Sequence, residues 1–447
     1  MVARKLNRMI AEHPTLLRNK ASTMQTRPLL VILDRNADLI TPIQHTSTYQ
    51  ALIDDLLKHK ANRVEFEVVQ DPDSKRPKKT SKRFDLDPDK DPFYSAHKFQ
   101  PFPEAIESNE SELQEVTARE AEIRSKSSGN VGAVDPLASG TGDLATAVGS
   151  LPALLDRKKK LDVHTSILQA VMNEVAARDV PQFYELESAL ATGTFKNDLP
   201  KAKRDVLALI SDATKGNMKD KVRLAVVYAL ATGAKTADLD EVTAAIQEVA
   251  DTMATDSNES QGVKVDLENG FKAIAYLKQL RSMHMIPAAT DMFQELQSDN
   301  KTVGNAPSSS GGMLLSSLMG KATAQASDLL AKATDKVASM LGKIHKHHAT
   351  VVVENLCDYK PGSEDESYLY LDPKVRGDVD VAKLRSMSRP AAVREVICFV
   401  IGGGCYGEYQ NLQMMLADSD ENRVVTYGST ELCSSTEFLQ QLGQLGT

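Results

Sequence analysis

Two short apolar runs near opposite ends of the chain have no alternation of apolar and polar positions. They are residues 29–33 (LLVIL) and residues 396–401 (VICFVI). Such runs are typical of strands buried on both faces of a parallel sheet. Residues 409–416 predict a helix after the second run, and residues 422–432 (NRVVTYGSTEL) predict another strand. Residues 349–359 (ATVVVENLCDY) indicate one more strand.

A helix is predicted directly after the first apolar run. Thr41 is in the N-cap position, Pro42 in the first helical position, and Gln44 is placed to complete a capping box. Strands with intervening helices favour a parallel α/β sheet.

The middle of the chain has the periodicity of helices instead. Residues 150–190 place an apolar stripe at alternating spacings of three and four, formed by Leu161, His164, Leu168, Val171 and Val175. Val163 and Ile167 lie off this stripe, which predicts that the helix buries two faces. Further helices are predicted at residues 219–233, 237–250 and 270–283.

The fold class that follows is α/β plus mainly α. We expect a parallel-sheet domain built from residues 1–65 and 346–447, because its strands come from both ends of the chain. Residues 66–345 form the inserted, mainly helical domain. Exposed loops are predicted at residues 70–92 and 125–150, and a linker rich in Gly and Ser at residues 301–312.

Composition narrows the functional classes. The chain has 447 residues, 41% hydrophobic, and a net charge of -8, which does not favour binding to nucleic acid. Its four cysteines have no paired spacing, which favours free thiols in a reducing compartment. No apolar run is long enough to cross a bilayer, so we expect a cytosolic protein whose membrane contact is peripheral.

The turn after the second apolar run has the spacing of a dinucleotide site. Gly402, Gly404 and Gly407 match G-x-G-x-x-G, but the next strand ends without the carboxylate that holds the ribose. A tight strand-to-helix turn is the favoured interpretation. Asp34 ends a strand where α/β enzymes place carboxylates, yet a D-x-D phosphotransferase needs a second carboxylate where Asn36 stands. An α/β enzyme that binds a nucleotide at residues 402–407, or uses Asp34, remains the alternative.

Three histidines near residue 346 are the one candidate metal cluster. His345, His347 and His348 have no acidic or cysteine partner at ligand spacing, and a solvated helix end is the favoured interpretation. No hydrolase, metalloprotease or P-loop motif occurs. The sequence therefore predicts no catalytic residue, no cofactor and no metal.

Long blocks of the sequence resemble a known family in the same order. The first is RPLLVILDRNADLITPIQHTSTYQALIDDLL, followed by LPALLDRKKKLDVHTSILQAVM, DKVRLAVVYALATG and VICFVIGGGCYGEYQNL. Together they resemble the SM (Sec/Munc) proteins, the cytosolic chaperones of SNARE assembly, and most closely the Sly branch of traffic between the endoplasmic reticulum and the Golgi. Members normally begin with a further N-terminal domain, which this chain is expected to lack.

The resemblance implies a non-enzymatic protein that templates SNARE assembly in ER–Golgi or intra-Golgi transport. Its partners would be syntaxin-type and vesicle SNAREs, with tethering complexes as further candidates, and the protein would be a monomer held on ER and Golgi membranes through partners. The template is predicted on residues 152–190, with Pro152 in the first turn of the helix of residues 153–178. The predicted partner-binding residues are Pro152, Leu161, His164, Thr165, Ile167, Leu168, Val171 and Met172.

Overall fold

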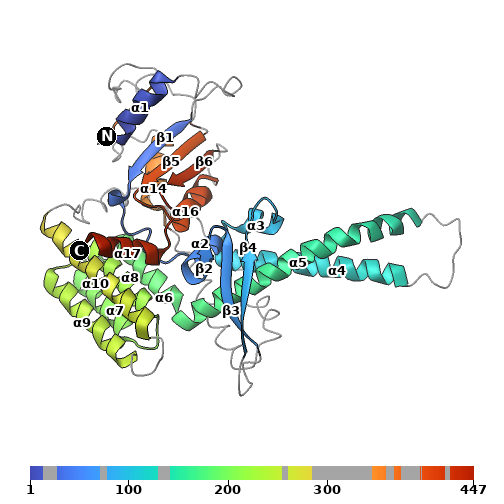
Figure 1. Ribbon diagram of the computed structural model, residues 1–447, viewed down its shortest axis with the longest axis horizontal. Coiled ribbons are helices and arrows are strands. Elements are labelled where there is room, and N and C mark those ends of the chain that lie inside the picture. Colours follow the sequence, from blue (N-terminus) through green and yellow to red (C-terminus); the bar gives the residue numbers. More distant parts are fainter. Residues whose placement is uncertain are drawn as a thin grey trace. The chain divides into compact units, whose positions relative to one another are not determined.

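The computed structural model describes residues 1–13, 28–70, 78–128, 141–253, 260–283, 345–358, 367–373, 393, 395–417 and 423–446 (Figure 1). The chain forms two compact units. The first contains Met1–Gln44, Glu185–Gly304 and His345–Thr447, and the second contains His45–Tyr184 and Asn305–Ile344. The linker predicted at residues 301–312 lies outside the described residues.

A parallel sheet joins the two ends of the chain in the first unit. Its strands β1 (Leu29–Asp34), β5 (Glu395–Ile401) and β6 (Val424–Ser429) lie in the order β1-β5-β6, with Leu29 beside Val396. The three predicted strands and the split of this sheet between distant segments are therefore confirmed. Helices α14 (His348–Asp358) and α16 (Tyr406–Ala417) contribute to the same core as the sheet.

The strand predicted at residues 349–359 is wrong, because this segment is helix α14. Its buried side chains include Ala349, Val352, Val353 and Leu356, which recur at helical spacing and pack with the sheet. The run of three valines reads as a strand by propensity alone, but the burial follows the helical period.

Five further helices of the first unit pack as a bundle. They are α7 (Leu199–Ser211), α8 (Met218–Thr232), α9 (Thr236–Met253), α10 (Ser260–Ser282) and α17 (Ser435–Leu445). Helix α8 is buried along nearly its whole length. Basic side chains close two helix ends: Lys221 donates to the carbonyl of Ile210 at 2.8 Å, and Arg281 donates to the carbonyl of Ala234 at 2.7 Å.

The second unit combines a small antiparallel sheet with a helical hairpin. Strands β2 (Lys58–Lys60), β3 (Arg63–Gln70) and β4 (Lys78–Asp85) lie in the order β2-β3-β4. The helices are α2 (Tyr49–Leu56), α3 (Pro92–His97), α4 (Phe102–Ser128) and α5 (Thr141–Arg178). Their shared core includes Tyr49, Phe66, Phe102 and Leu161. Helix α6 (Val180–Ala191) contains the point at which the chain passes between the units.

The structure corrects two local predictions. The helix predicted after the first apolar run, α2, begins at Tyr49 rather than at Pro42, because Thr41 donates its backbone N–H and its hydroxyl to the Asp38 carboxylate and stays in a turn. Gln44 completes no capping box and donates to the Ser188 hydroxyl at 2.9 Å. Part of the loop predicted at residues 70–92 is strand β4, whose charged side chains pair across the hairpin with β3.

The two units also cut the chain differently from the predicted boundary at residue 65, whereas the predicted boundary at residue 345 is within one residue of the observed one. The structure separates the chain after Gln44 and Tyr184, since α2 and β2–β4 share their core with α4 and α5. The bundle α7–α10 belongs to the same unit as the parallel sheet. Other small elements of this unit are α1 (Val2–Glu12) and the 3-10 turn η2 (Arg35–Ala37).

The turn between β2 and β3 uses two residues with left-handed backbone. Ala61 has φ 50° and Asn62 has φ 62°, which is the geometry of a two-residue type I′ hairpin turn. Asn tolerates this region, but the Cβ of Ala makes it unfavourable there.

Ala61→Gly should therefore stabilise the protein. Glycine adopts positive φ without this penalty, and we expect a gain of about 0.5–1 kcal/mol in the free energy of unfolding, measured by urea denaturation. Ala61→Val is the matched opposite change and should destabilise. Equal midpoints for the three proteins would show that this turn is not strained.

Candidate functional site

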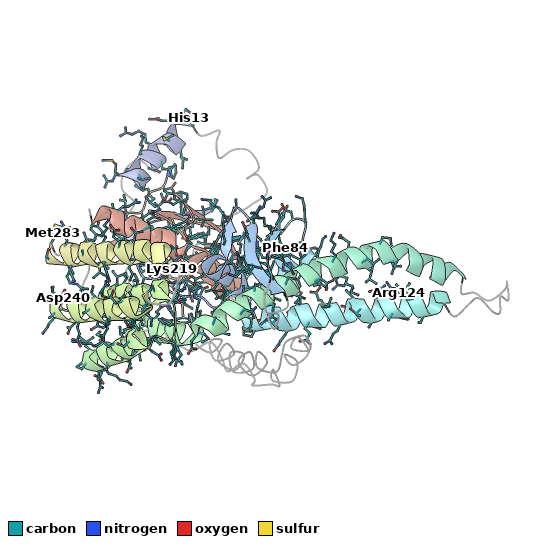
Figure 2. All side chains as sticks on the ribbon, turned by 60° about the horizontal axis from the view of Figure 1, so that its bottom comes forward. His13, Phe84, Arg124, Lys219, Asp240 and Met283 are labelled. Atoms are coloured by element: carbon teal, nitrogen blue, oxygen red, sulfur yellow. The ribbon has the colours of Figure 1, made fainter. Side chains whose placement is uncertain are left out.

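Helices α4 and α5 form a long antiparallel pair in the second unit, which can be followed in Figures 1 and 2, where Arg124 marks α4. Charged side chains join them along their length. Arg157 donates to Glu112 at 2.8 Å, and Lys158 donates to Glu120 at 2.7 Å. The predicted partner-binding residues all lie on α5, so this helical pair is the candidate site.

Most of the predicted partner-binding residues face the core of this unit. The buried ones have exposed fractions between 0% and 4%: Leu161, His164, Ile167, Leu168, Val171 and Met172. The prediction that the helix buries two faces is thus borne out by the burial of both Ile167 and Leu168. These side chains expose almost no surface to a partner in this arrangement. Their role in binding is not tested by the structure and stays a prediction.

His164 is held between two polar groups inside this core. Its Nδ1 lies 2.9 Å from the Tyr49 hydroxyl and its Nε2 lies 3.0 Å from Asp91 Oδ2. Asp91 also accepts the backbone N–H of Tyr94 and caps α3. Although burial works in the opposite direction, the bonds from His164 and Tyr94 lower the pKa of Asp91. This network ties α5 to α2 and α3 and gives His164 a structural role.

Thr165 and Pro152 are the two predicted residues with accessible surface. Thr165 is half-buried, and its hydroxyl accepts from Asn109 Nδ2 at 2.8 Å, which links α5 to α4. Pro152 is exposed and lies inside α5, which begins at Thr141. The predicted helix start at Pro152 is therefore wrong. A proline removes only one hydrogen bond of a long helix, and the preceding turn can continue with a bend.

The outward face of α5 was not selected from the sequence. It carries the exposed residues Leu155, Lys159, Asp162 and Asn173, which lie opposite the buried stripe. Leu155 is 41% exposed and is the large apolar side chain among them. The sequence does contain a pattern for this face, since its polar residues are spaced three or four apart. Every surface helix has such a pattern, so it does not distinguish a binding face.

In the turn between β5 and α16, the amides of the first three glycines are already bonded within the protein. The N–H groups of Gly402 and Gly403 donate to the Thr430 hydroxyl at 3.1 and 3.2 Å, and that of Gly404 donates to the Glu431 carbonyl at 2.8 Å. Gly402 and Gly403 have φ of 105° and 96°, which requires glycine. Gly404 is needed for a different reason, because a Cβ there would lie 2.2 Å from the Tyr427 hydroxyl.

A buried ion pair occupies the interior of this turn. Arg35 donates from both terminal nitrogens to Glu408, at 3.0 and 3.1 Å, and Tyr427 donates its hydroxyl to the same carboxylate. Burial alone would lower the pKa of Arg35, but Glu408 and Asp38 outweigh burial and raise it. Asp34, the other enzyme candidate, accepts the backbone N–H of Asn36 and closes a turn.

The histidines near residue 346 are half-buried rather than fully solvated, and the Nδ1 atoms of His345 and His347 are shielded from water, which corrects the predicted solvated helix end. Asn411 holds their backbone: it donates to the carbonyl of His345 at 2.8 Å and accepts the N–H of His347 at 2.9 Å. Burial lowers the pKa of His345 to about 3 and that of His347 to about 4. Within the described ranges, no three His, Cys, Asp or Glu side chains gather closely enough to hold a metal ion.

Comparison with known proteins identifies the family of this chain. The profile of the Sec1 family matches residues 1–441. The chain belongs to the Sec1 family. It is 32% identical to Sec1 family domain-containing protein 1 of Homo sapiens over 468 aligned residues, which cover 100% of this chain and 66% of that protein. The resemblance found in the sequence is thus confirmed.

Two solved structures of Sec1-family type share the fold. The crystal structure of Sly1p in complex with an N-terminal peptide of Sed5p is 23% identical, with a TM-score of 0.62, over 100% of this chain and 62% of that one. The SM protein Vps45 in complex with the Qa SNARE Tlg2 is 18% identical, with a TM-score of 0.63, over 99% and 64%. This chain spans about two thirds of the length of these relatives. None of the described helices is long and apolar enough to cross a membrane.

The Arg35 pair should dominate the stability of this Sec1-family sheet unit. Arg35→Met leaves the Glu408 carboxylate buried without its partner, and we expect a loss of about 3–5 kcal/mol in the free energy of unfolding. Arg35→Met combined with Glu408→Gln should recover part of this loss, because no buried charge then remains unpaired. Chemical denaturation of the wild type, both single variants and the double variant gives the coupling. Additive losses would show that the two side chains act independently.

Acid should destabilise this Sec1-family chain through His345 and His347, whose pKa values are lowered in the folded state. In the unfolded chain His345 and His347 take up protons as the pH falls below 6.5. In the folded chain both side chains stay neutral down to a pH of about 4. Stability is present above pH 6.5 and is lost as the pH falls. We expect a loss of about 4 kcal/mol between pH 7 and pH 5 from the two groups together.

The control is a variant that carries both His345→Leu and His347→Leu, whose stability should change less over the same range. Urea denaturation at each pH measures the difference between the two proteins. Parallel pH profiles would show that other groups cause the acid sensitivity.

Proposed function

We propose that this chain is a SNARE-binding part of a Sec1-family protein, without enzymatic activity, that holds SNARE helices side by side during vesicle docking and fusion. The observation that carries the proposal is the family match over residues 1–441. Two solved complexes of proteins with the same fold support it: Vps45 was solved with the Qa SNARE Tlg2, and Sly1p with an N-terminal peptide of Sed5p.

We place the SNARE contact on the outward face of α5. The apolar stripe of α5 serves the core, so a partner helix would meet Leu155, Lys159, Asp162 and Asn173 together with the exposed Pro152. This face is mainly polar, so charge and hydrogen bonding would set the register of the partner, and Leu155 would be its apolar anchor.

A rigid template has a physical advantage for such partners. Isolated SNARE segments lose conformational entropy when they become helical, and this cost opposes their assembly. The α4–α5 pair is already ordered by the core of its unit and by the bonds from Glu112 and Asn109. When one SNARE helix is bound to this pair, the next helix loses less conformational entropy as it assembles.

The Sly1p likeness favours the pathway between the endoplasmic reticulum and the Golgi. On this proposal the partners are syntaxin-type and vesicle SNAREs of that pathway, with tethering complexes as further partners. The chain would act as a monomer and reach these membranes through its partners. The alternative function, an enzyme that binds a nucleotide, has no supporting observation, because the amides of Gly402, Gly403 and Gly404 are already bonded.

Leu155→Glu should weaken SNARE binding at least tenfold without unfolding the protein. Leu155 is 41% exposed, so a carboxylate there stays in water when the protein is free but is desolvated when a helix packs on it. Calorimetry with syntaxin-type and vesicle SNARE peptides measures the change in Kd.

The matched control is Leu199→Glu, which changes an equally accessible leucine, 46% exposed, at the start of α7 in the other unit. It should bind like wild type. Thr165→Glu is a poorer test, since it would also break the Asn109 bond. A folded Leu155→Glu protein that binds every SNARE peptide as tightly as wild type would remove α5 as the contact.

A further inference from the structure

Strand β4 ends the small antiparallel sheet of the second unit. The strand order is β2-β3-β4, so among the described residues no strand pairs with the outer side of β4. All eight residues of β4 pair with β3 in unbroken register, from Lys78 beside Gln70 to Asp85 beside Arg63. No proline or bulge interrupts this strand, although these are devices that commonly block a sheet edge.

The outward backbone groups of β4 can be assigned from the ladder. The N–H of Leu86 donates to the carbonyl of Asn62, so residues 62 and 86 form a hydrogen-bonded pair. In an antiparallel ladder such pairs alternate with pairs whose backbone groups point away from each other. The N–H and C=O groups of Lys79, Ser81 and Arg83 therefore point away from β3, toward the open edge.

The same three residues have exposed side chains, as does Asp85 at the end of β4, which is paired with Arg63 at 2.7 Å. The side chains of Lys79 and Arg83 are 70% and 68% exposed. Arg83 lies 3.0 Å from Glu65, Lys79 lies 3.4 Å from Glu67, and the Ser81 hydroxyl donates to Glu65 at 3.3 Å. Exposed ion pairs of this kind are weak, so a new acidic partner can replace them at little cost.

The opposite face of β4 is attached to the core. Phe84 packs with Phe66 at a ring distance of 5.9 Å, and Lys82 donates to the Ser166 hydroxyl of α5 at 3.4 Å. The phenylalanine is labelled in Figure 2. This attachment holds the strand in its extended form, so its open edge is presented ready for pairing.

Charge selects what can pair there. The described side chains of the three strands include six cations and three carboxylates, in a chain whose net charge is -8. Basic side chains on an edge repel a second copy of the same strand and attract an acidic one.

We propose that the outer edge of β4 binds an extended segment of a partner protein in which acidic and apolar residues alternate. The segment would add a fourth strand through the backbone groups of Lys79, Ser81 and Arg83. Its acidic residues would lie beside Lys79 and Arg83, and its apolar residues would continue the face that carries Phe84.

The test uses Ser81→Pro, because proline removes an outward N–H but none that the ladder with β3 uses. The probe is a fluorescein-labelled peptide, Val-Glu-Val-Glu-Val-Glu, whose binding to the full chain is followed by anisotropy. Wild type should bind the peptide, and Ser81→Pro should raise the Kd at least tenfold. Ser81→Ala is the matched control, which keeps the N–H and should bind within twofold of wild type.

A second arm tests the charges without altering the backbone. Lys79→Gln combined with Arg83→Gln should weaken binding at least fivefold, and a peptide with Lys in place of Glu should not bind wild type. Circular dichroism and thermal midpoints check that each variant is folded. If Ser81→Pro fails to fold, the charge variant and the loss of amide hydrogen exchange at residues 79, 81 and 83 on peptide binding decide the question.

Three results would overturn the proposal. One is no binding of the acidic peptide to wild type at millimolar concentration, and another is unchanged binding to folded Ser81→Pro. The third is binding of vesicles that contain anionic lipid as tightly as the peptide, lost in the charge variant but kept in Ser81→Pro. That result would make the strand a general anion surface rather than an edge for strand addition.

Discussion

The ion pair between Arg35 and Glu408 joins segments from the two ends of the chain within the first unit. Arg35 follows β1, and Glu408 lies in the first turn of α16, 373 residues later in the sequence. Both side chains are nearly excluded from water, so neither can be buried without the other. This ion pair thus links the segment after β1 to the helix after β5, at the end of the two neighbouring strands.

The surroundings of this pair explain the glycine turn. Tyr427 on β6 donates to Glu408, and the space that its hydroxyl needs excludes a Cβ at position 404. Gly402 and Gly403 then turn the chain with positive φ, and Thr430 satisfies their amides. The G-x-G-x-x-G spacing also occurs in nucleotide sites, but here it forms a tight turn of this sheet, because the amides of Gly402, Gly403 and Gly404 have internal acceptors.

The second unit depends on α5, whose two faces have different tasks. The face with Leu161, Ile167 and Val171 supports the core together with α2 and α4, and the His164 network fixes its position against α3. The outward face remains available to a partner. Because the sheet β2-β3-β4 packs on the same core, the helical surface and the open edge of β4 are held by one rigid framework, and two different binding modes can coexist in one unit.

The amino-acid sequence determined the elements whose signal is local. Unbroken apolar runs gave β1 and β5, the polar and apolar period gave α5, and the order of long blocks gave the family. It did not determine where helices begin near prolines. Asp38 accepts the backbone N–H of Thr41, so helix α2 begins only at Tyr49, and α5 continues through Pro152. It also could not separate core from binding surface on α5, because an apolar stripe predicts burial without saying what buries it. Only the tertiary structure decided that α2 and α4 cover this stripe and that Arg35 meets Glu408, since these contacts join residues distant in the chain. It also showed that no described strand pairs with the outer side of β4.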